Sequence, residues 1–294
     1  MSRVRHYVSL VRPEQWIKNA FVLAPLIFSR ELFESGPFLT ALAATGGFCL
    51  AAGAVYSIND LTDLKSDRAH PVKKKRPLAS GVISGAEALI VACLLLVLAF
   101  GLTAGFGIGF HVILASYVAI NIFYSLKLKE IVLVDVFLIA SGFMLRVLGG
   151  AYAINVPVSS WIILCTLFIS LFLGFGKRRA ELVMGGVEGE MLDRKVLHHY
   201  SVGFLDQMLT ISAAGAVITY ALYTVAPSTL IIFKTDKVIY TTVFVIFGIF
   251  RYLYLVHAKR STDNPTLTVT TDIPILLTGL AWILVCSALI YLHE

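Results

Sequence analysis

The sequence predicts an all-α integral membrane protein, and three observations support this prediction. Of the 294 residues, 58% are hydrophobic and only 14% are charged, whereas a soluble domain carries about 25% charged residues. Apolar stretches of about 20 residues, the length that crosses a bilayer as a helix, recur from one end of the chain to the other. Lysine and arginine concentrate in alternate connections between these stretches. A soluble enzyme would have nowhere to bury so many apolar stretches.

Hydropathy indicates about nine candidate transmembrane helices. Pro25 interrupts the first of them, and polar residues flank it. The approximate limits of the nine are 16–33, 37–58, 83–104, 107–124, 131–153, 157–176, 206–226, 236–256 and 272–292.

The basic residues predict how these helices are oriented. All but four of the 24 lysines and arginines fall on one side; the exceptions are Arg30, Arg146, Lys234 and Lys237. By the positive-inside rule, the crowded side is cytoplasmic. The N-terminus is therefore expected inside, and nine spans would put the C-terminus outside. We expect a multi-pass protein of the cell (inner) membrane.

Loop lengths indicate where the chemistry takes place. The two long polar loops, 59–82 and 177–205, lie on the predicted cytoplasmic side, and the external connections are short. A protein that keeps its functional groups at one membrane face has this pattern. We expect one transmembrane domain over 1–294, with an active site at the cytoplasmic loops near 59–82 and 177–205.

The second apolar segment ends in a run of carboxylates. Asn59, Asp63 and Asp67 step by four residues, and Asp60 lies between them. A continuing helix would place all four side chains within an arc of about 100°. Like charges on one helix face repel one another, and carboxylates are costly at the edge of a bilayer. Oxygen ligands suit Mg²⁺, which is commonly shared with substrate phosphates. The sequence therefore predicts Mg²⁺ on these four residues.

Four cations, Lys73 to Arg76, follow the carboxylates directly. Carboxylates for a metal and cations for phosphate oxygens are the groups needed to hold a metal–polyphosphate complex. The alternative is a solvated helix end that is merely acidic. That alternative does not account for the cations, so the pattern favours a diphosphate site.

These stretches resemble the UbiA superfamily of membrane prenyltransferases. The motif from Asn59 to Asp67, with His70-Pro71 and the stretch 76–81, is similar to the first signature of that family. The resemblance extends over essentially the whole chain and implies nine transmembrane helices around a central cavity, in a single prenyltransferase-like domain. Four further stretches are most similar to the subgroup of decaprenyl-phosphate phosphoribosyltransferases: 12–19, 124–127, 141–146 and 175–182.

The resemblance implies a specific reaction. Enzymes of this subgroup transfer 5-phosphoribose from phosphoribosyl pyrophosphate to a polyprenyl phosphate, release pyrophosphate and use Mg²⁺. The expected partners are these two substrates and the bilayer, with no nucleic acid, in a pathway of cell-wall polysaccharide biosynthesis. Oligomeric state and the chain length of the lipid stay open.

One stretch departs from the general superfamily pattern. Ordinary members carry a second aspartate-rich motif after the sixth helix, where this chain has Lys177, Arg178 and Arg179. Glu181 is the only acid nearby, and later acids lack the spacing. Cations in place of carboxylates suggest direct contact with a phosphate, without a bridging metal.

The remaining site residues follow from the proposed substrates. Asn59, Asp60, Asp63 and Asp67 would act through the metal on the departing pyrophosphate. The donor phosphates are assigned to Lys18, Lys73 and Arg76, and the acceptor phosphate to Lys127, Lys177 and Arg178. The nucleophile is a phosphate oxygen that is already ionised, so no general base is required.

Two further residues are assigned to the site. Tyr124 reaches it by a hydrogen bond or by packing, or else anchors a helix end at the membrane interface. Arg146 lies within an apolar run, where an unpaired charge costs at least about 2.5 kcal/mol. We therefore expect Arg146 to face the cavity and meet a phosphate or a carboxylate such as Asp135.

Two other functions remain open. A conventional prenyltransferase would join a prenyl diphosphate to an aromatic acceptor, and a second genuine aspartate motif would favour it; that motif is absent. A transporter also carries charges within the membrane, but it predicts inverted repeats and broken helices near the bilayer centre. Here the charges gather at one membrane face.

Overall fold

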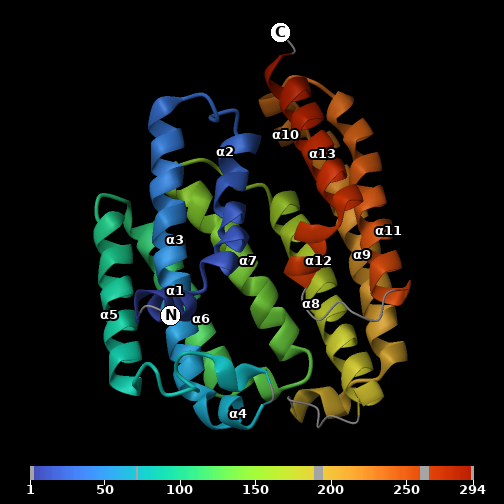
Figure 1. Ribbon diagram of the computed structural model, residues 1–294. Helices are drawn as coiled ribbons and strands as arrows, with labels where there is room; N and C mark the ends of the chain where they lie inside the picture. The colour runs from blue at the N-terminus through green and yellow to red at the C-terminus, as the bar shows by residue number, and fades with distance from the viewer. Residues whose placement is uncertain (1–2, 71, 189–194, 259–264, 293–294) are drawn as a thin grey trace. The chain divides into compact units, whose positions relative to one another are not determined.

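The structure, a computed structural model, describes residues 3–70, 72–188, 195–258 and 265–292 (Figure 1). Within these ranges the regular structure is entirely helical. The α-helices are α1 (Arg3–Val11), α2 (Ala24–Phe28), α3 (Ser35–Thr62), α4 (Leu64–Ala69), α5 (Gly85–Leu102), α6 (Ile108–Leu126), α7 (Val134–Ala153), α8 (Ser160–Glu188), α9 (Val202–Val225), α10 (Pro227–Phe233), α11 (Thr242–Ala258), α12 (Pro265–Thr271) and α13 (Ile273–Tyr291). The 3-10 helices are η1 (Pro13–Leu23), η2 (Lys73–Lys75), η3 (Leu128–Glu130), η4 (Lys195–His199) and η5 (Lys237–Thr241).

Eight helical segments of the described chain are long and apolar enough to cross a membrane. They are α3, α5, α6, α7, α8, α9, η5 with α11, and α13. Each corresponds to one of the nine expected segments, so the prediction of an all-α, multi-pass membrane protein is confirmed. The count of nine is approximate.

The expected first segment, 16–33, folds differently from the other eight. It is divided between η1 and the five-residue helix α2. Pro13 begins η1, and Pro25 lies at the start of α2, where it supplies no backbone N–H to continue the preceding helix. Pro25, which interrupts the apolar run in the sequence, therefore lies where the 3-10 helix η1 gives way to the α-helix α2.

The two expected cytoplasmic loops are partly helical. α8 continues to Glu188, past the expected end at 176, so Lys177 and Arg178 lie on a helix. The sequence Lys-Arg-Arg-Ala-Glu-Leu consists of good helix formers without glycine or proline. Residue 71 of the first loop and residues 189–194 of the second lie outside the described residues.

The chain forms two compact units, each discontinuous in sequence. The first, called unit 1 here, comprises Met1–Leu26, Glu31–Ile131 and Leu145–Pro157. Unit 2 comprises Ile27–Arg30, Val132–Met144 and Val158–Glu294. Helix α7 contributes its first part to unit 2 and its second part to unit 1.

In unit 1, α3 packs against α5, α6 and η1, and Figure 1 shows α3 and α5 side by side. Small residues allow close approach of helices, as is typical in membranes. The closest approach is at Gly150 of α7, where an added Cβ would lie 1.9 Å from the carbonyl oxygen of Val22 in η1. Next to it, the Phe48 ring packs against Phe110 and Tyr117, with ring centroids 6.0 and 5.3 Å apart.

In unit 2, α8 packs against α9 along its length, and α11 packs against α13. The core between these helices includes Phe172 and Tyr252, whose ring centroids lie 5.0 Å apart. Glycines again allow the contact, because an added Cβ at Gly176 would lie 2.6 Å from the hydroxyl of Tyr252.

The close approach at Gly150 gives a test of the fold. We expect Gly150→Ala to lower stability by about 1–3 kcal/mol, as overpacking of a core does, because a backbone carbonyl cannot rotate away. The control is Gly101→Ala in α5, where an added Cβ meets nothing within 4 Å. Thermal denaturation of both variants in detergent would measure the difference. Equal midpoints would contradict the packing of α7 on η1.

Candidate active site

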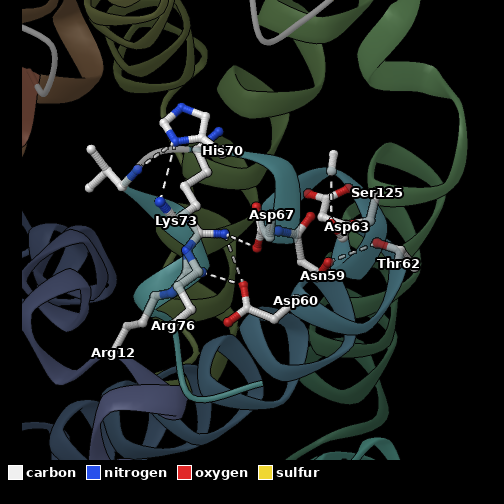
Figure 2. A network of polar contacts seen from close by, with 12 residues as sticks. Arg12, Asn59, Asp60, Thr62, Asp63, Asp67, His70, Lys73, Arg76 and Ser125 are labelled. Atoms are coloured by element: carbon white, nitrogen blue, oxygen red, sulfur yellow. Dashed lines mark hydrogen bonds and ion pairs between the residues drawn. The ribbon is translucent and has the colours of Figure 1, made fainter. Parts of the chain in front are cut away.

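The aspartate motif lies where α3 gives way to α4 (Figure 2). The backbone N–H of Asp63 donates to Asn59 O at 2.9 Å, and that of Asp67 donates to Asp63 O at 2.8 Å. These hydrogen bonds keep the helical spacing across the junction, although Asp63 itself departs from helical geometry with φ −91° and ψ 3°. The expected four-residue step from Asn59 to Asp67 is therefore present.

Asp60 and Asp67 are buried and share one guanidinium group. The Nη1 atom of Arg76 lies 3.3 Å from Asp60 Oδ1 and 2.6 Å from Asp67 Oδ2. Arg12 forms a second ion pair with the same oxygen of Asp60. Figure 2 shows both arginines reaching the carboxylates from one side. Two carboxylates thus converge on a single positive group.

Asp63 and Asn59 have partners on η3 and α6, each 66 residues further along the chain. Lys129 of η3 forms an ion pair with Asp63. The Ser125 hydroxyl of α6 donates to Asn59 Oδ1 at 2.9 Å. The three carboxylates of the motif therefore have three basic partners: Arg12, Arg76 and Lys129. Buried charges need such compensation, because their desolvation is costly.

Arg12 is held in an unusual backbone conformation. Its φ of 51° and ψ of 64° are left-handed, which few residues other than glycine adopt. The next residue is Pro13, which restricts the backbone of Arg12 further. The guanidinium carbon lies 5.2 Å from the centre of the Tyr56 ring. Strain of this kind costs about 1–3 kcal/mol and gathers at functional sites.

A short turn brings Arg76 back to the motif. The ring nitrogen Nδ1 of His70 accepts hydrogen bonds from the backbone N–H groups of Val72 and Lys73, at 3.1 and 3.2 Å. The 3-10 helix η2 follows, and the backbone N–H of Arg76 donates to Lys73 O at 2.9 Å. Because Nδ1 accepts two hydrogen bonds, this arrangement requires it to be unprotonated. His70 therefore stabilises the turn that leads into the basic residues of η2.

Arg146 lies in a separate buried polar cluster of unit 1. It is 5% exposed; its Nε donates to Asn19 Oδ1 at 2.7 Å, and its Nη2 donates to the Tyr117 hydroxyl at 2.9 Å. Its guanidinium carbon also lies 4.7 Å from the centre of the Tyr117 ring. The carboxylate suggested as its partner, Asp135, pairs with Arg178 instead.

Arg178 is fully buried in unit 2, between two carboxylates. Its Nε lies 2.6 Å from Asp135 Oδ2, and its Nη1 lies 2.6 Å from Glu181 Oε2. The Tyr200 hydroxyl donates to Asp135 Oδ1 at 2.9 Å and accepts from the backbone N–H of Leu133 at 2.7 Å. Leu133 has a left-handed φ of 66°. Burial raises the pKa of Tyr200 to about 12, so its hydroxyl stays protonated at neutral pH.

The other predicted site residues are distributed over both units. In unit 1, Lys18 on η1 and Tyr124 on α6 are half-buried, and Lys127 is exposed at the end of α6. In unit 2, Lys177 lies 3.8 Å from Glu181, with 37% of its side chain exposed. The structure thus gathers Asn59, the three aspartates and Arg76. The phosphate contacts assigned to individual cations stay predictions.

Two residues of the network were missed by sequence reasoning. Arg12 lies in a stretch that supports the family resemblance, but only the structure gives its contact with Asp60. Lys129 lies two residues after the predicted Lys127, and its charge was counted only as an orientation signal. The available signal was a basic residue in a short connection that the lysine and arginine count assigns to the same side as the motif.

The motif fits Mg²⁺ by the chemistry of its donors. Among the described residues, no group of three or more His, Cys, Asp or Glu side chains is arranged to hold a metal ion. Asp60 and Asp67 nevertheless converge on one cationic nitrogen, which occupies a position between two carboxylates that also suits a metal ion. Asp63 would become a further metal ligand if its ion pair with Lys129 were broken, and Asn59 would supply an amide oxygen as a fourth ligand.

Comparisons with known proteins identify relatives in sequence and in structure. The sequence model of the UbiA prenyltransferase family matches residues 21–270. A decaprenyl-phosphate phosphoribosyltransferase from Mycolicibacterium smegmatis is 38% identical over 224 residues, which are 74% of this chain and 69% of that protein. A protein of the same name from Corynebacterium glutamicum is 35% identical over 220 residues, 74% of this chain and 66% of that protein.

Solved structures support the same fold. A UbiA homologue from Archaeoglobus fulgidus, bound to GPP and Mg²⁺, superposes with a TM-score of 0.73 at 19% identity, covering 97% of this chain and 99% of that one. The same homologue bound to Cd²⁺ gives a TM-score of 0.69 at 18% identity, with the same coverage. At this identity the likeness shows the fold alone, and it confirms the predicted UbiA-like architecture.

The contacts of Tyr200 give a test of the buried network in unit 2. We expect Tyr200→Phe to lower stability by about 1–3 kcal/mol, because it removes a hydrogen-bond partner from Leu133 and from buried Asp135. The matched control is Tyr240→Phe, whose side chain is 76% exposed. Thermal denaturation in detergent would compare the two variants. A Tyr200→Phe midpoint equal to that of the control would contradict the hydrogen bonds described.

Proposed function

Because the chain belongs to the UbiA prenyltransferase family, we propose that it is a polyprenyl-phosphate phosphoribosyltransferase. It transfers 5-phosphoribose from phosphoribosyl pyrophosphate to decaprenyl phosphate or a similar lipid and releases pyrophosphate. The observation that carries this proposal is the similarity to four decaprenyl-phosphate phosphoribosyltransferases, at 33–38% identity over 74% of the chain. The alignments span 66–72% of those proteins' own length.

The charge distribution supports a single metal–diphosphate site. Unit 1 holds the aspartate motif, with Arg76 between Asp60 and Asp67. The stretch where the resemblance implies a second aspartate motif in ordinary family members holds Lys177 and Arg178 instead, and the buried Arg178 pairs with Asp135 of α7. One pyrophosphate donor and one lipid monophosphate acceptor need only one such metal site.

The reaction is a substitution at the anomeric carbon of ribose. The bond from this carbon to the pyrophosphate oxygen breaks, and pyrophosphate leaves with the electron pair. A bond forms from the same carbon to an oxygen of the lipid phosphate. We expect a transition state with oxocarbenium character, as in glycosyl transfer generally. The attacking oxygen is ionised at neutral pH, so the protein's task is positioning and charge compensation.

Residues of unit 1 bind and orient the donor. Magnesium, when bound by Asp60, Asp63, Asp67 and Asn59, supplies positive charge to the departing pyrophosphate. Arg76, Lys73 and Lys18 contact the donor phosphates. The buried Arg146, held by Asn19 and Tyr117, adds positive charge within the same unit.

The predicted acceptor contacts in unit 2 have different roles. Arg178 is fully buried and engaged by two carboxylates, so it fixes Asp135 and Glu181. Lys177, with 37% of its side chain exposed, is accessible to a phosphate. We assign the direct contact in this unit to Lys177.

The orientation in the membrane follows from the basic loops. The aspartate motif and the start of η2 lie in the cytoplasmic loop predicted from the lysine and arginine count. Phosphoribosyl pyrophosphate is a water-soluble, highly charged donor that does not cross a bilayer. A cytoplasmic active site in the cell membrane is therefore part of the proposal.

Turnover by the purified protein would test the proposed reaction. We expect a phosphoribosylated lipid from phosphoribosyl pyrophosphate and decaprenyl phosphate, with Mg²⁺, and none after chelation with EDTA. Parallel reactions would contain a polyprenyl diphosphate and an aromatic acid. Product only in these reactions would replace the proposal with a conventional prenyltransferase.

The carboxylates of the motif give a second test. Asp67→Asn keeps the shape of the side chain but removes the negative charge shared with Arg76, and we expect activity to fall at least about 100-fold. The control is Asp236→Asn, an exposed residue before η5. Comparable activity in Asp67→Asn and the control would exclude a metal-binding role for Asp67.

A further inference from the structure

The carboxylates proposed to bind Mg²⁺ are already occupied by positive charge. Asp60 contacts Arg12 and Arg76, Asp67 contacts Arg76, and Asp63 contacts Lys129. Three negative charges of the motif therefore meet three positive charges. A metal ion on the same oxygens would lie within a few ångström of these cations and would repel them. The basic side chains and a metal ion therefore compete for the same carboxylates.

The cations have longer and more flexible side chains than the carboxylates they contact. Asp60 and Asp67 have side chains only 2% and 5% exposed and lie on helices, and Asp63, at the junction of these helices, has a side chain 24% exposed. Arg12, Arg76 and Lys129 have side chains 19%, 28% and 19% exposed. Each of the three reaches its carboxylate with a long, flexible side chain. Displacement would therefore swing the cations away from the buried oxygens of Asp60 and Asp67 and release Asp63 from Lys129.

We propose that Arg12, Arg76 and Lys129 act as exchangeable counter-ions of the metal site. Without ligands they neutralise the aspartates. When Mg²⁺ enters together with a diphosphate, they transfer to the phosphate oxygens, where charge-assisted hydrogen bonds replace the lost ion pairs. Arg12 and Lys129 thereby become diphosphate contacts, in addition to Arg76.

The exchange couples the two ligands. Metal alone displaces cations that then have no phosphate to bind, so its affinity is low. Metal and diphosphate together satisfy every charge, so each raises the affinity for the other by the same factor. This inference rests on the metal–diphosphate site of the proposed function. It does not depend on whether the donor carries ribose or a prenyl group.

Lys129→Met isolates the exchange, because it keeps the length of the side chain and removes the charge that neutralises Asp63. We expect the variant to bind Mn²⁺ alone at least 5-fold more tightly than the unaltered protein, since one competing cation is gone. At saturating Mn²⁺ we expect it to bind pyrophosphate at least 10-fold more weakly. Electron paramagnetic resonance of unbound Mn²⁺ and isothermal titration calorimetry with pyrophosphate would measure the two affinities.

The control is Lys234→Met, at an exposed lysine in unit 2 that follows α10; neither affinity should change. Lys129→Arg should restore pyrophosphate binding, because it restores the charge. Arg12→Met should also bind Mn²⁺ alone more tightly and pyrophosphate more weakly. It replaces Lys129→Met in the experiment if the Lys129 variant does not fold. Unchanged or weaker binding of Mn²⁺ alone, or unchanged binding of pyrophosphate, in a folded variant would overturn the inference. Opposite shifts without phosphoribosyl transfer would overturn only the proposed function.

Discussion

Carboxylates at the end of a membrane-spanning helix must be neutralised, and unit 1 is arranged around this requirement. Asp60 is 2% exposed and lies two residues before the end of α3. Its counter-charges come from two other parts of the chain, Arg12 at the start of η1 and Arg76 after η2. These ion pairs fix the segments that carry them against α3. The same contacts that hold the fold at this end also assemble the charges of the candidate active site.

Unit 2 meets the same requirement with the signs reversed. There the buried charge is a cation, Arg178 on α8, and the compensation comes from Asp135 on α7 and Glu181 on α8. Tyr200 completes the network and holds the left-handed backbone of Leu133 at the beginning of α7. The basic stretch from Lys177 to Arg179 is thus partly structural in this chain.

The sequence predicted features that depend on local pattern. Apolarity over about 20 residues identified eight helical segments, and the four-residue step of the aspartates survives across the junction at Asp63. Features that depend on contacts distant in sequence were not predictable. Arg12 pairs with a residue 48 positions away, and Lys129 with one 66 positions away. No periodicity in the sequence predicts such pairs. The extension of α8 to Glu188 was not predicted because the added residues are too polar to register as part of an apolar segment.

The left-handed backbone at Arg12 sets backbone strain against charge compensation at one position. Glycine would adopt φ 51° without strain, so it is the residue that the backbone alone would favour here. The same change would remove one of the two arginines on Asp60 and the cation over the Tyr56 ring. Relief of the backbone strain would therefore be outweighed by the loss of a counter-charge from buried Asp60, and stabilising this membrane protein for biochemical work should leave position 12 unchanged.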